Sequence, residues 1–239
     1  MQEKTFFCET FVVLYRRFNI FISSEGSNYM TVLIAIAARP NNVDQVPYIL
    51  MGSDSLEINL ERDLTEIGRN EDADKIFKVN DKLVSISGRF DPSFRGSFLE
   101  FLNEKDCELA RLHKLAYQFV YDHMENVEIN DDAKCAIYIG CCTKSTPELV
   151  DIRINKNDLS NAVCAYEVAG NEQFIVKMAG SIGVPKDDDL SDTFMSRVTK
   201  GCPTASLSCV RKAAEEYLKN AAARYPETCN QNIKFKRLR

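Results

Sequence analysis

Blocks of apolar residues alternate with polar breaks along most of the chain, and they predict strands and helices in a definite order. The run TVLIAIAAR at residues 31–39 is continuously apolar and rich in β-branched side chains, which is typical of a strand buried on both faces. Residues 48–55 (YILMGSDS) predict the hairpin partner of this strand. Residues 75–79 and 83–87 predict a second strand pair, joined by a turn at residues 80–82.

The pattern changes twice in the rest of the chain. Residues 59–74 are charged and have no usable periodicity, so we expect a long loop or a short surface element. From Pro92 the apolar spacing becomes helical and predicts two helices, the second over residues 104–125. Strands then return, followed by two helices and a last strand. The later strands are expected at residues 134–141, 149–154, 162–167, 174–178 and 232–236, and the later helices at 190–200 and 203–225.

This order of elements indicates the fold class. Grouped runs of strands and helices favour α+β layers over alternating βαβ units, which argues against a doubly wound nucleotide-binding fold. A chain of 239 residues, 45% of them apolar, can bury one substantial core. We therefore expect a single domain over residues 30–239.

Residues 1–29 are expected to stand apart from that domain. A polar, turn-rich break at residues 23–28 separates their apolar stretches from the first strand. Two interpretations remain open. The segment is either a propeptide or added surface segment, or sequence upstream of a true start at Met30.

Charge and cysteine content exclude several functions. Thirty basic and 35 acidic side chains give a net charge of -5, which argues against a nucleic-acid footprint and a polybasic membrane patch. No apolar run reaches the roughly 18 residues that a membrane span requires. The nine cysteines are scattered, and only two histidines are present to complete a metal site. We expect no metal or cofactor, and reduced cysteines in a cytoplasmic protein.

Both histidines fall in the predicted helix at residues 104–125. At these positions, His113 and His123 are expected to be surface or helix-packing side chains. Catalysis by this chain would therefore not use histidine.

Four residues are expected to converge at one edge of the predicted sheets. Thr31 begins the first strand, Asp54 ends its hairpin partner, Lys75 opens the third strand and Gly88 closes the fourth. In antiparallel strands, the start of one strand lies beside the end of its neighbour, so these positions can meet. Taken singly, each residue also has an ordinary structural role as a strand opener, hairpin polar residue, edge charge or turn glycine.

Four motifs in this order resemble the catalytic β subunits of proteasomes and their bacterial relatives: TVLIAIAAR, LMGSDS, DKIFKVNDKLVSISG and MAGSIG. The resemblance covers most of residues 31–236, with two helices between the halves. It implies an α+β fold of the four-layer αββα Ntn-hydrolase type, with two antiparallel sheets. It also implies a threonine-type peptidase in a self-compartmentalising assembly, acting through an acyl-enzyme.

The resemblance assigns a role to five residues. Thr31 matches the N-terminal nucleophile, Asp54 the acid ending the second strand, and Lys75 the lysine beside the nucleophile. Gly88 matches the glycine of the oxyanion hole, and Ser181 matches the serine of the second G-S-x-G turn. A free α-amine with a pKa of about 7.7 to 8 is suited to take the proton of a threonine hydroxyl, so no histidine is required.

Two of the chain's departures from the family pattern bear most directly on the predicted nucleophile and its surroundings. Tyr29 and Met30 precede the threonine where precursors of the family have glycine, so removal of an initiator Met is the more natural route to a free Thr31. Near the last strand the family has an aspartate and a serine, and Pro226 and Cys229 lie closest to those positions.

The resemblance also implies partners, and it leaves alternatives open. The implied partners are a peptide or unfolded-protein substrate, further copies in a homo-oligomeric ring and an ATP-dependent unfoldase. One alternative is a non-catalytic structural subunit that keeps residues 1–29. The other is an Ntn amidohydrolase that acts on a small molecule and shares only the nucleophile.

Overall fold

The computed structural model describes most of the chain after residue 30. The expected extension at residues 1–29 lies outside the described part. The described ranges are residues 31–41, 45–60, 66–88, 93–105, 107–126, 134–169, 174–179 and 189–239.

Strands and helices occur in grouped runs, as the sequence predicts. The strands are β1 (Leu33–Ala38), β2 (Tyr48–Asp54), β3 (Glu57–Leu60), β4 (Glu66–Asn70), β5 (Ile76–Val79), β6 (Lys82–Gly88), β7 (Lys134–Thr143), β8 (Thr146–Asn155), β9 (Val163–Val168), β10 (Phe174–Ala179) and β11 (Ile233–Leu238). The helices are α2 (Phe94–Glu104), α3 (Leu109–Asn126), α4 (Asp189–Gly201) and α5 (Leu207–Arg224). All strand pairs within the described residues are antiparallel, which confirms the expected α+β class with antiparallel sheets.

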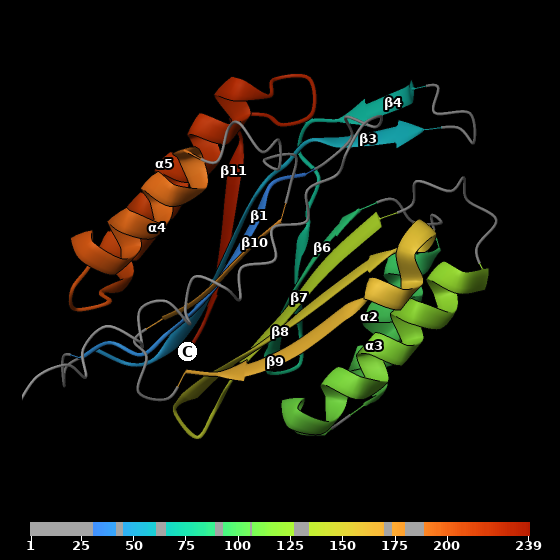
Figure 1. Ribbon diagram of the computed structural model, residues 1–239, viewed down its shortest axis with the longest axis horizontal. Helices are drawn as coiled ribbons and strands as arrows, with labels where there is room; N and C mark the ends of the chain where they lie inside the picture. The colour runs from blue at the N-terminus through green and yellow to red at the C-terminus, as the bar shows by residue number, and fades with distance from the viewer. Residues whose placement is uncertain are drawn as a thin grey trace, which may run out of the picture.

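One sheet has the strand order β10-β1-β2-β11 and carries α4 and α5 on one face (Figure 1). Alternate residues of β1 point to opposite faces, as in any strand. Ile34 and Ile36 belong to the apolar cluster formed with α4 and α5, whereas Leu33 and Ala35 belong to the cluster on the other face. Because both faces are covered by protein, β1 is apolar at every position.

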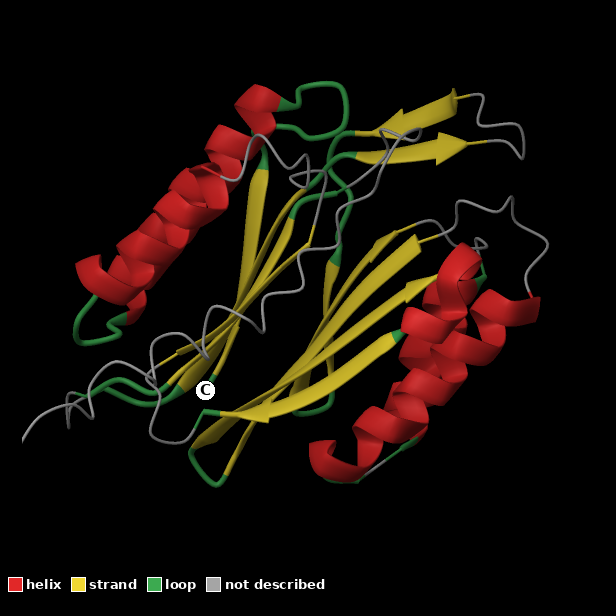
Figure 2. Cartoon of the chain, in the orientation of Figure 1, coloured by secondary structure: helices red, strands yellow, loops and turns green. Residues whose placement is uncertain are grey.

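A second sheet has the strand order β5-β6-β7-β8-β9, and α2 and α3 pack on its outer face (Figure 2). Its inner face meets the first sheet. Leu83 and Tyr138 from the second sheet share a buried cluster with Ile49 and Met51 from β2. Both sheets therefore contribute to the apolar interface between them, and the ends of their strands lie near one another.

The segment expected to be a loop or short surface element contains two strands. β3 and β4 pair in a separate two-stranded sheet, with a register irregularity at Asn59. The residues of β4 are exposed apart from the half-buried Gly68. Such a hairpin is held by backbone pairing and leaves no alternation of buried and exposed side chains, so the sequence pattern missed it.

Two predicted helix starts are wrong. The helix expected from residue 104 begins at Leu109, because the chain makes a separate turn at Cys107, whose N–H donates to Lys105 O. The helix expected from residue 203 begins at Leu207. Ala205 has a left-handed φ of 52° and its N–H donates to Cys202 O, so a tight turn precedes the helix.

This turn also brings two cysteines together. Cys202 and Cys209 form a disulfide, with their Cα atoms 5.8 Å apart, within the usual range for such a bond. The expectation of fully reduced cysteines is therefore wrong for this pair. The other cysteines in the described residues are free thiols.

Both histidines pack against aromatic rings on the helix side of the second sheet. His113 stacks on Tyr166 with ring centroids 5.2 Å apart, and His123 lies 4.5 Å from Phe94. The prediction of helix-packing histidines is confirmed. None of the helices in the described ranges is long and apolar enough to cross a membrane.

Candidate active site

The ends of β1 and β2 bring Thr31 and Asp54 together. Antiparallel pairing places Leu33 opposite Ser53, so the next residues outward, Val32 and Asp54, also lie side by side. The Val32 N–H donates to Asp54 Oδ1 at 3.0 Å, and the Asp54 N–H donates to Val32 O at 3.4 Å. Thr31 is therefore held one residue away from the carboxylate.

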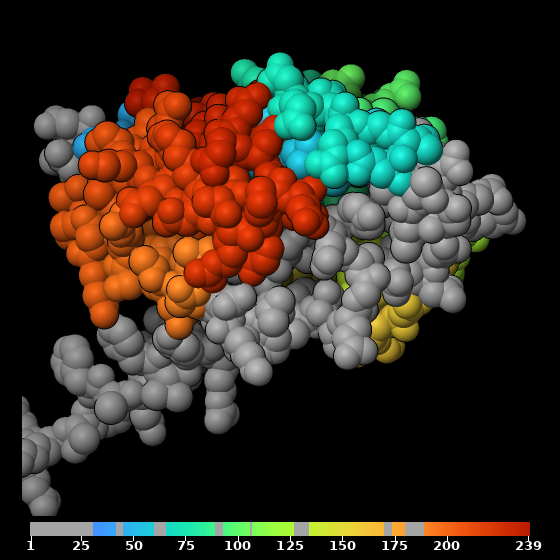
Figure 3. All heavy atoms as spheres, turned by 90° about the horizontal axis from the view of Figure 1, so that it is seen from above, coloured from blue at the N-terminus to red at the C-terminus, as the bar shows by residue number. Residues whose placement is uncertain are grey.

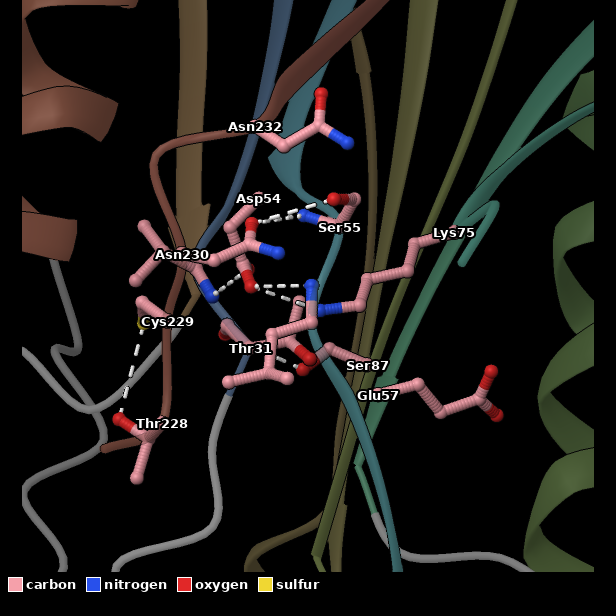
Figure 4. Close-up of polar contacts among 12 residues, drawn as sticks. Thr31, Asp54, Ser55, Glu57, Lys75, Ser87, Thr228, Cys229, Asn230 and Asn232 are labelled. Atoms are coloured by element: carbon pink, nitrogen blue, oxygen red, sulfur yellow. Dashed lines mark hydrogen bonds and ion pairs between the residues drawn. The ribbon is translucent and has the colours of Figure 1, made fainter. Parts of the chain in front are cut away.

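Lys75 reaches the same place from the second sheet. It directly precedes β5, and its carbonyl oxygen accepts the N–H of Ile86 on β6 at 3.1 Å. Its Nζ lies 3.1 Å from Asp54 Oδ2, and this oxygen also accepts the N–H of Leu56 at 3.0 Å (Figure 4). The lysine side chain is 7% exposed and the aspartate side chain 1%. The two sheets are thus joined by a buried ion pair.

Burial and pairing act in opposite directions on this pair. Burial raises the pKa of Asp54, while the positive charge of Lys75 and the N–H groups of Leu56 and Val32 lower it. Burial lowers the pKa of Lys75, while the charge of Asp54 raises it. For both groups burial is the larger effect. A buried lysine with a lowered pKa gives up its proton more readily than a free lysine, and the charge of Asp54 opposes that loss.

Ser87 links the end of β6 to Thr31. Its hydroxyl donates to the carbonyl oxygen of Thr31 at 3.4 Å, and Thr31 itself is half-buried (Figure 4). Sequence reasoning did not select Ser87, because a serine at the end of an apolar strand motif carries no signal of this contact.

Gly88 follows Ser87 at the end of β6, and the backbone conformation and close neighbours of this position allow only glycine. Its φ is 132°, which L side chains rarely adopt. A Cβ at this position would lie 2.2 Å from Lys134 O and 2.7 Å from the Cα of Cys135. Among the five residues predicted for the site, Lys75 pairs directly with Asp54, and Asp54 bonds Val32, the residue after Thr31. Gly88 lies next in the chain to Ser87, which contacts Thr31. Ser181 lies outside the described residues.

The segment before β11 also lies near the Asp54–Lys75 ion pair. Cys229 is buried, and burial raises the pKa of its thiol to about 11, with a further contribution from the charge of Asp54. It is therefore a neutral thiol near pH 7. On the surface this C-terminal part of the chain lies against the segment that includes β3 and β4 (Figure 3). Nothing in the local sequence of residues 228–232 predicts this contact.

The site holds a threonine, Thr31, whose neighbour Val32 bonds to a buried lysine–carboxylate pair. In the described parts of the chain no group of three or more His, Cys, Asp or Glu side chains is arranged to hold a metal ion. Both histidines are in α3 and packed on aromatic rings. The amine of Lys75 is the basic side chain that the structure places on Asp54, one residue from Thr31.

Comparisons with known proteins give structural likenesses only. No protein-family model matches the sequence, and no curated protein is significantly similar to it. The fold is similar to that of eukaryotic HslV from Trypanosoma brucei, with 12% identity over 86% of this chain and 98% of that chain and a TM-score of 0.48. It is also similar to Thiobacillus denitrificans BPH in complex with epoxomicin, with 13% identity over 87% of this chain and 97% of that chain and a TM-score of 0.49. Likenesses at this level do not bear on function.

Proposed function

We propose that this chain is a threonine-type peptidase of the proteasome-like Ntn-hydrolase kind, with Thr31 as the nucleophile. The observation that carries the proposal is the buried Asp54–Lys75 pair, whose carboxylate binds the backbone one residue from Thr31. The packing of a helix pair on the outer face of each of two facing sheets supports the αββα form of this fold.

The proposed reaction uses Thr31 in two steps. The free α-amine takes the hydroxyl proton, Oγ attacks the scissile carbonyl carbon, and the Gly88 N–H donates to the resulting oxyanion. The C–N bond then breaks, the leaving amine takes a proton, and an ester remains on Thr31. Water, oriented by Ser181, hydrolyses this ester and returns the hydroxyl. Lys75 favours loss of the hydroxyl proton through its nearby positive charge, and Asp54 keeps Lys75 charged.

The mechanism requires that Thr31 carry a free amine. In the proposal, either the segment 1–30 is removed or translation starts at Met30 and that Met is cleaved off. The proposal further includes a homo-oligomeric ring in the cytoplasm that receives peptides or proteins opened by an ATP-dependent unfoldase. Sedimentation of the mature chain tests the ring independently of activity.

The central test compares Thr31 with a threonine elsewhere. The chain expressed from Met30 is checked by intact mass for a Thr31 start and then assayed on fluorogenic peptide amides. Thr31→Ala is expected to lower kcat/KM at least about 1,000-fold, because no other group replaces the nucleophile. Thr199→Ala, at an exposed helix position where the hydroxyl bonds only Met195 O among the contacts described, is the control and is expected to keep full activity.

The same samples separate the alternatives. Incubation with a peptide 4-nitrophenyl ester is expected to add the mass of the acyl group to the peptide containing Thr31. Turnover of small amides without turnover of peptides would instead indicate an amidohydrolase. A chain with a free Thr31 amine that neither acylates nor hydrolyses any of these substrates would contradict catalysis and support the structural subunit.

A further inference from the structure

A half-buried asparagine joins the segment that carries Asp54 to the segment that carries Lys75. Asn230 lies just before β11, and its Oδ1 accepts the N–H of Ser55 at 3.1 Å. Its Nδ2 donates to the carbonyl oxygen of Glu71 at 2.8 Å and to Glu71 Oε2 at 3.1 Å. Ser55 is the residue after Asp54, and Glu71 precedes Lys75 by four residues. One amide therefore bonds both to the residue that follows Asp54 and to a residue of the segment that leads to Lys75, and Figure 4 shows Asn230 beside Ser55.

The orientation of this amide is determined by its partners. The N–H of Ser55 can only donate, so it must face the amide oxygen. The carbonyl oxygen of Glu71 can only accept, so it must face the amide nitrogen. Asparagine satisfies both sides at once. An aspartate of almost the same shape has no hydrogen to donate to Glu71.

Further hydrogen bonds carry this junction toward Lys75. The fully buried Ser55 donates its hydroxyl to Glu71 O at 2.6 Å, and its carbonyl oxygen accepts the N–H of Ala73 at 2.9 Å. Lys75 is two residues beyond Ala73. The backbone segment that leads to Lys75 is thus hydrogen-bonded to the segment that follows Asp54, and Asn230 bonds to both segments.

We infer that Asn230 is a positioning residue, which acts through Ser55 and Glu71 to set where the Lys75 amine lies relative to Asp54 and Thr31. This inference rests on the proposed function. Asn230 acts only through those neighbours. Its contribution should therefore appear in turnover and in the environment of Lys75, and not in substrate affinity.

The test substitutes Asn230→Asp, which keeps the shape and removes the donor. A carboxylate oxygen of the introduced aspartate then faces the carbonyl oxygen and the carboxylate of Glu71, and none of these can donate a hydrogen bond. The contact between the Ser55 and Glu71 segments is therefore weakened. We expect kcat to fall about 10- to 100-fold with KM within about twofold, because small displacements of catalytic groups have effects of this size. The matched control is Asn161→Asp, an exposed asparagine that donates to the Asp158 carboxylate at 2.9 and 2.8 Å. It is expected to keep the parent kcat.

A second substitution tests the direction of the bond. Glu71→Gln added to Asn230→Asp supplies an amide that can donate to the introduced carboxylate, so part of the lost kcat should return. Glu71→Gln alone should have little effect, because its amide oxygen still accepts from Asn230. If the Asn230→Asp chain does not fold, Asn230→Ser, which is too short to reach both segments, is measured in its place.

A readout on Lys75 itself separates this inference from the proposed function. NMR of chains labelled with ¹⁵N-lysine follows the Lys75 amine through a pH titration, with the signal assigned by Lys75→Arg. The pKa is read in Asn230→Ser, which adds no charge near the pair: there the pKa of Lys75 should rise toward that of a free lysine, since a loosened site admits water, while Asn161→Ser leaves it unchanged. If the parent chain hydrolyses no peptide, the proposed function fails and this titration still decides the role of Asn230. An unchanged pKa of Lys75, with unchanged kcat where the parent is active, overturns the inference.

Discussion

The β5–β6 hairpin carries a buried lysine at each end, and the two ends differ in what surrounds the charge. Lys75, at the open end, pairs with an aspartate whose side chain is 1% exposed. Lys82, at the turn end, is itself 4% exposed but pairs with Asp81, whose side chain is 75% exposed. Asp54 also accepts two backbone N–H groups, so it is held in place, whereas Asp81 lies in a turn. A buried lysine is therefore not sufficient to mark a site, and the fixed, buried counter-charge distinguishes Lys75.

The largest expected difference between the two ends is in activity. Lys75→Met should lower kcat/KM about 100- to 10,000-fold, the range for loss of a group that assists proton transfer. Lys82→Met removes a lysine of similar burial from the other end of the hairpin and should leave kcat/KM unchanged. Both variants are assayed on the same fluorogenic peptide. Equal losses would mean that the hairpin as a whole, and not the charge of Lys75, supports the reaction.

A smaller difference is expected in stability when the partners are changed. Asp54→Asn leaves Lys75 buried without a counter-charge and should cost about 3 to 5 kcal/mol of unfolding free energy. Asp81→Asn breaks a pair with one exposed partner and should cost less than about 1 kcal/mol. Urea denaturation at neutral pH measures both. Similar costs for the two substitutions would show that the carboxylate of Asp54 is not the feature that compensates the buried lysine.

The smallest expected difference is in the pH dependence of stability. Lys75→Met removes a charge that lowers the pKa of Asp54, so that pKa should rise further above its ordinary value of 3.8. An aspartate with a raised pKa in the folded state binds its proton more tightly there than in the unfolded chain. Its stabilisation is complete below about pH 4 and is lost as pH rises through the folded pKa.

The unfolding free energy of Lys75→Met should therefore decrease with rising pH above pH 4, by at most about 1.4 kcal/mol per pH unit for one proton. Lys82→Met keeps Lys75 beside Asp54 and serves as the reference. Denaturation curves collected from pH 4 to pH 8 give the comparison. Parallel pH profiles for the two variants would contradict a further rise of the Asp54 pKa on loss of Lys75.

Much of the fold followed from the sequence because its strands are buried on two faces. Continuous apolar runs such as residues 31–39 are hard to interpret as anything but buried strands. The turn at residues 80–82 is predicted by its residue types, which favour turns. The β3–β4 hairpin and the disulfide of Cys202 with Cys209 were missed for the opposite reason. Strand β4 of the hairpin is exposed along most of its length. The disulfide depends on a turn at Ala205, and alanine is not a residue type that predicts a turn.

The residues of the candidate site likewise fall into a group that the sequence predicts and a group that it does not. Asp54 and Lys75 stand at the ends of clear strand motifs, so the order of the strands was enough to place them near Thr31. Ser87 and Asn230 contribute through contacts between segments far apart in the chain, and short-range patterns carry no information about such contacts. Prediction from sequence therefore reached the charged pair but not the hydrogen bonds that hold its surroundings.

The contact between Ser55 and Asn230 can form only late in translation. The two residues are 175 positions apart, and at about 5 to 20 residues per second a ribosome takes roughly 9 to 35 seconds to pass from one to the other. Over this interval the strand that ends in Asp54 lacks its neighbour β11, and the amide that joins the two halves of the ion pair does not yet exist. A nascent chain therefore carries Thr31, Asp54 and Lys75 for many seconds before residue 230, which bonds to the segments around the ion pair, has been translated.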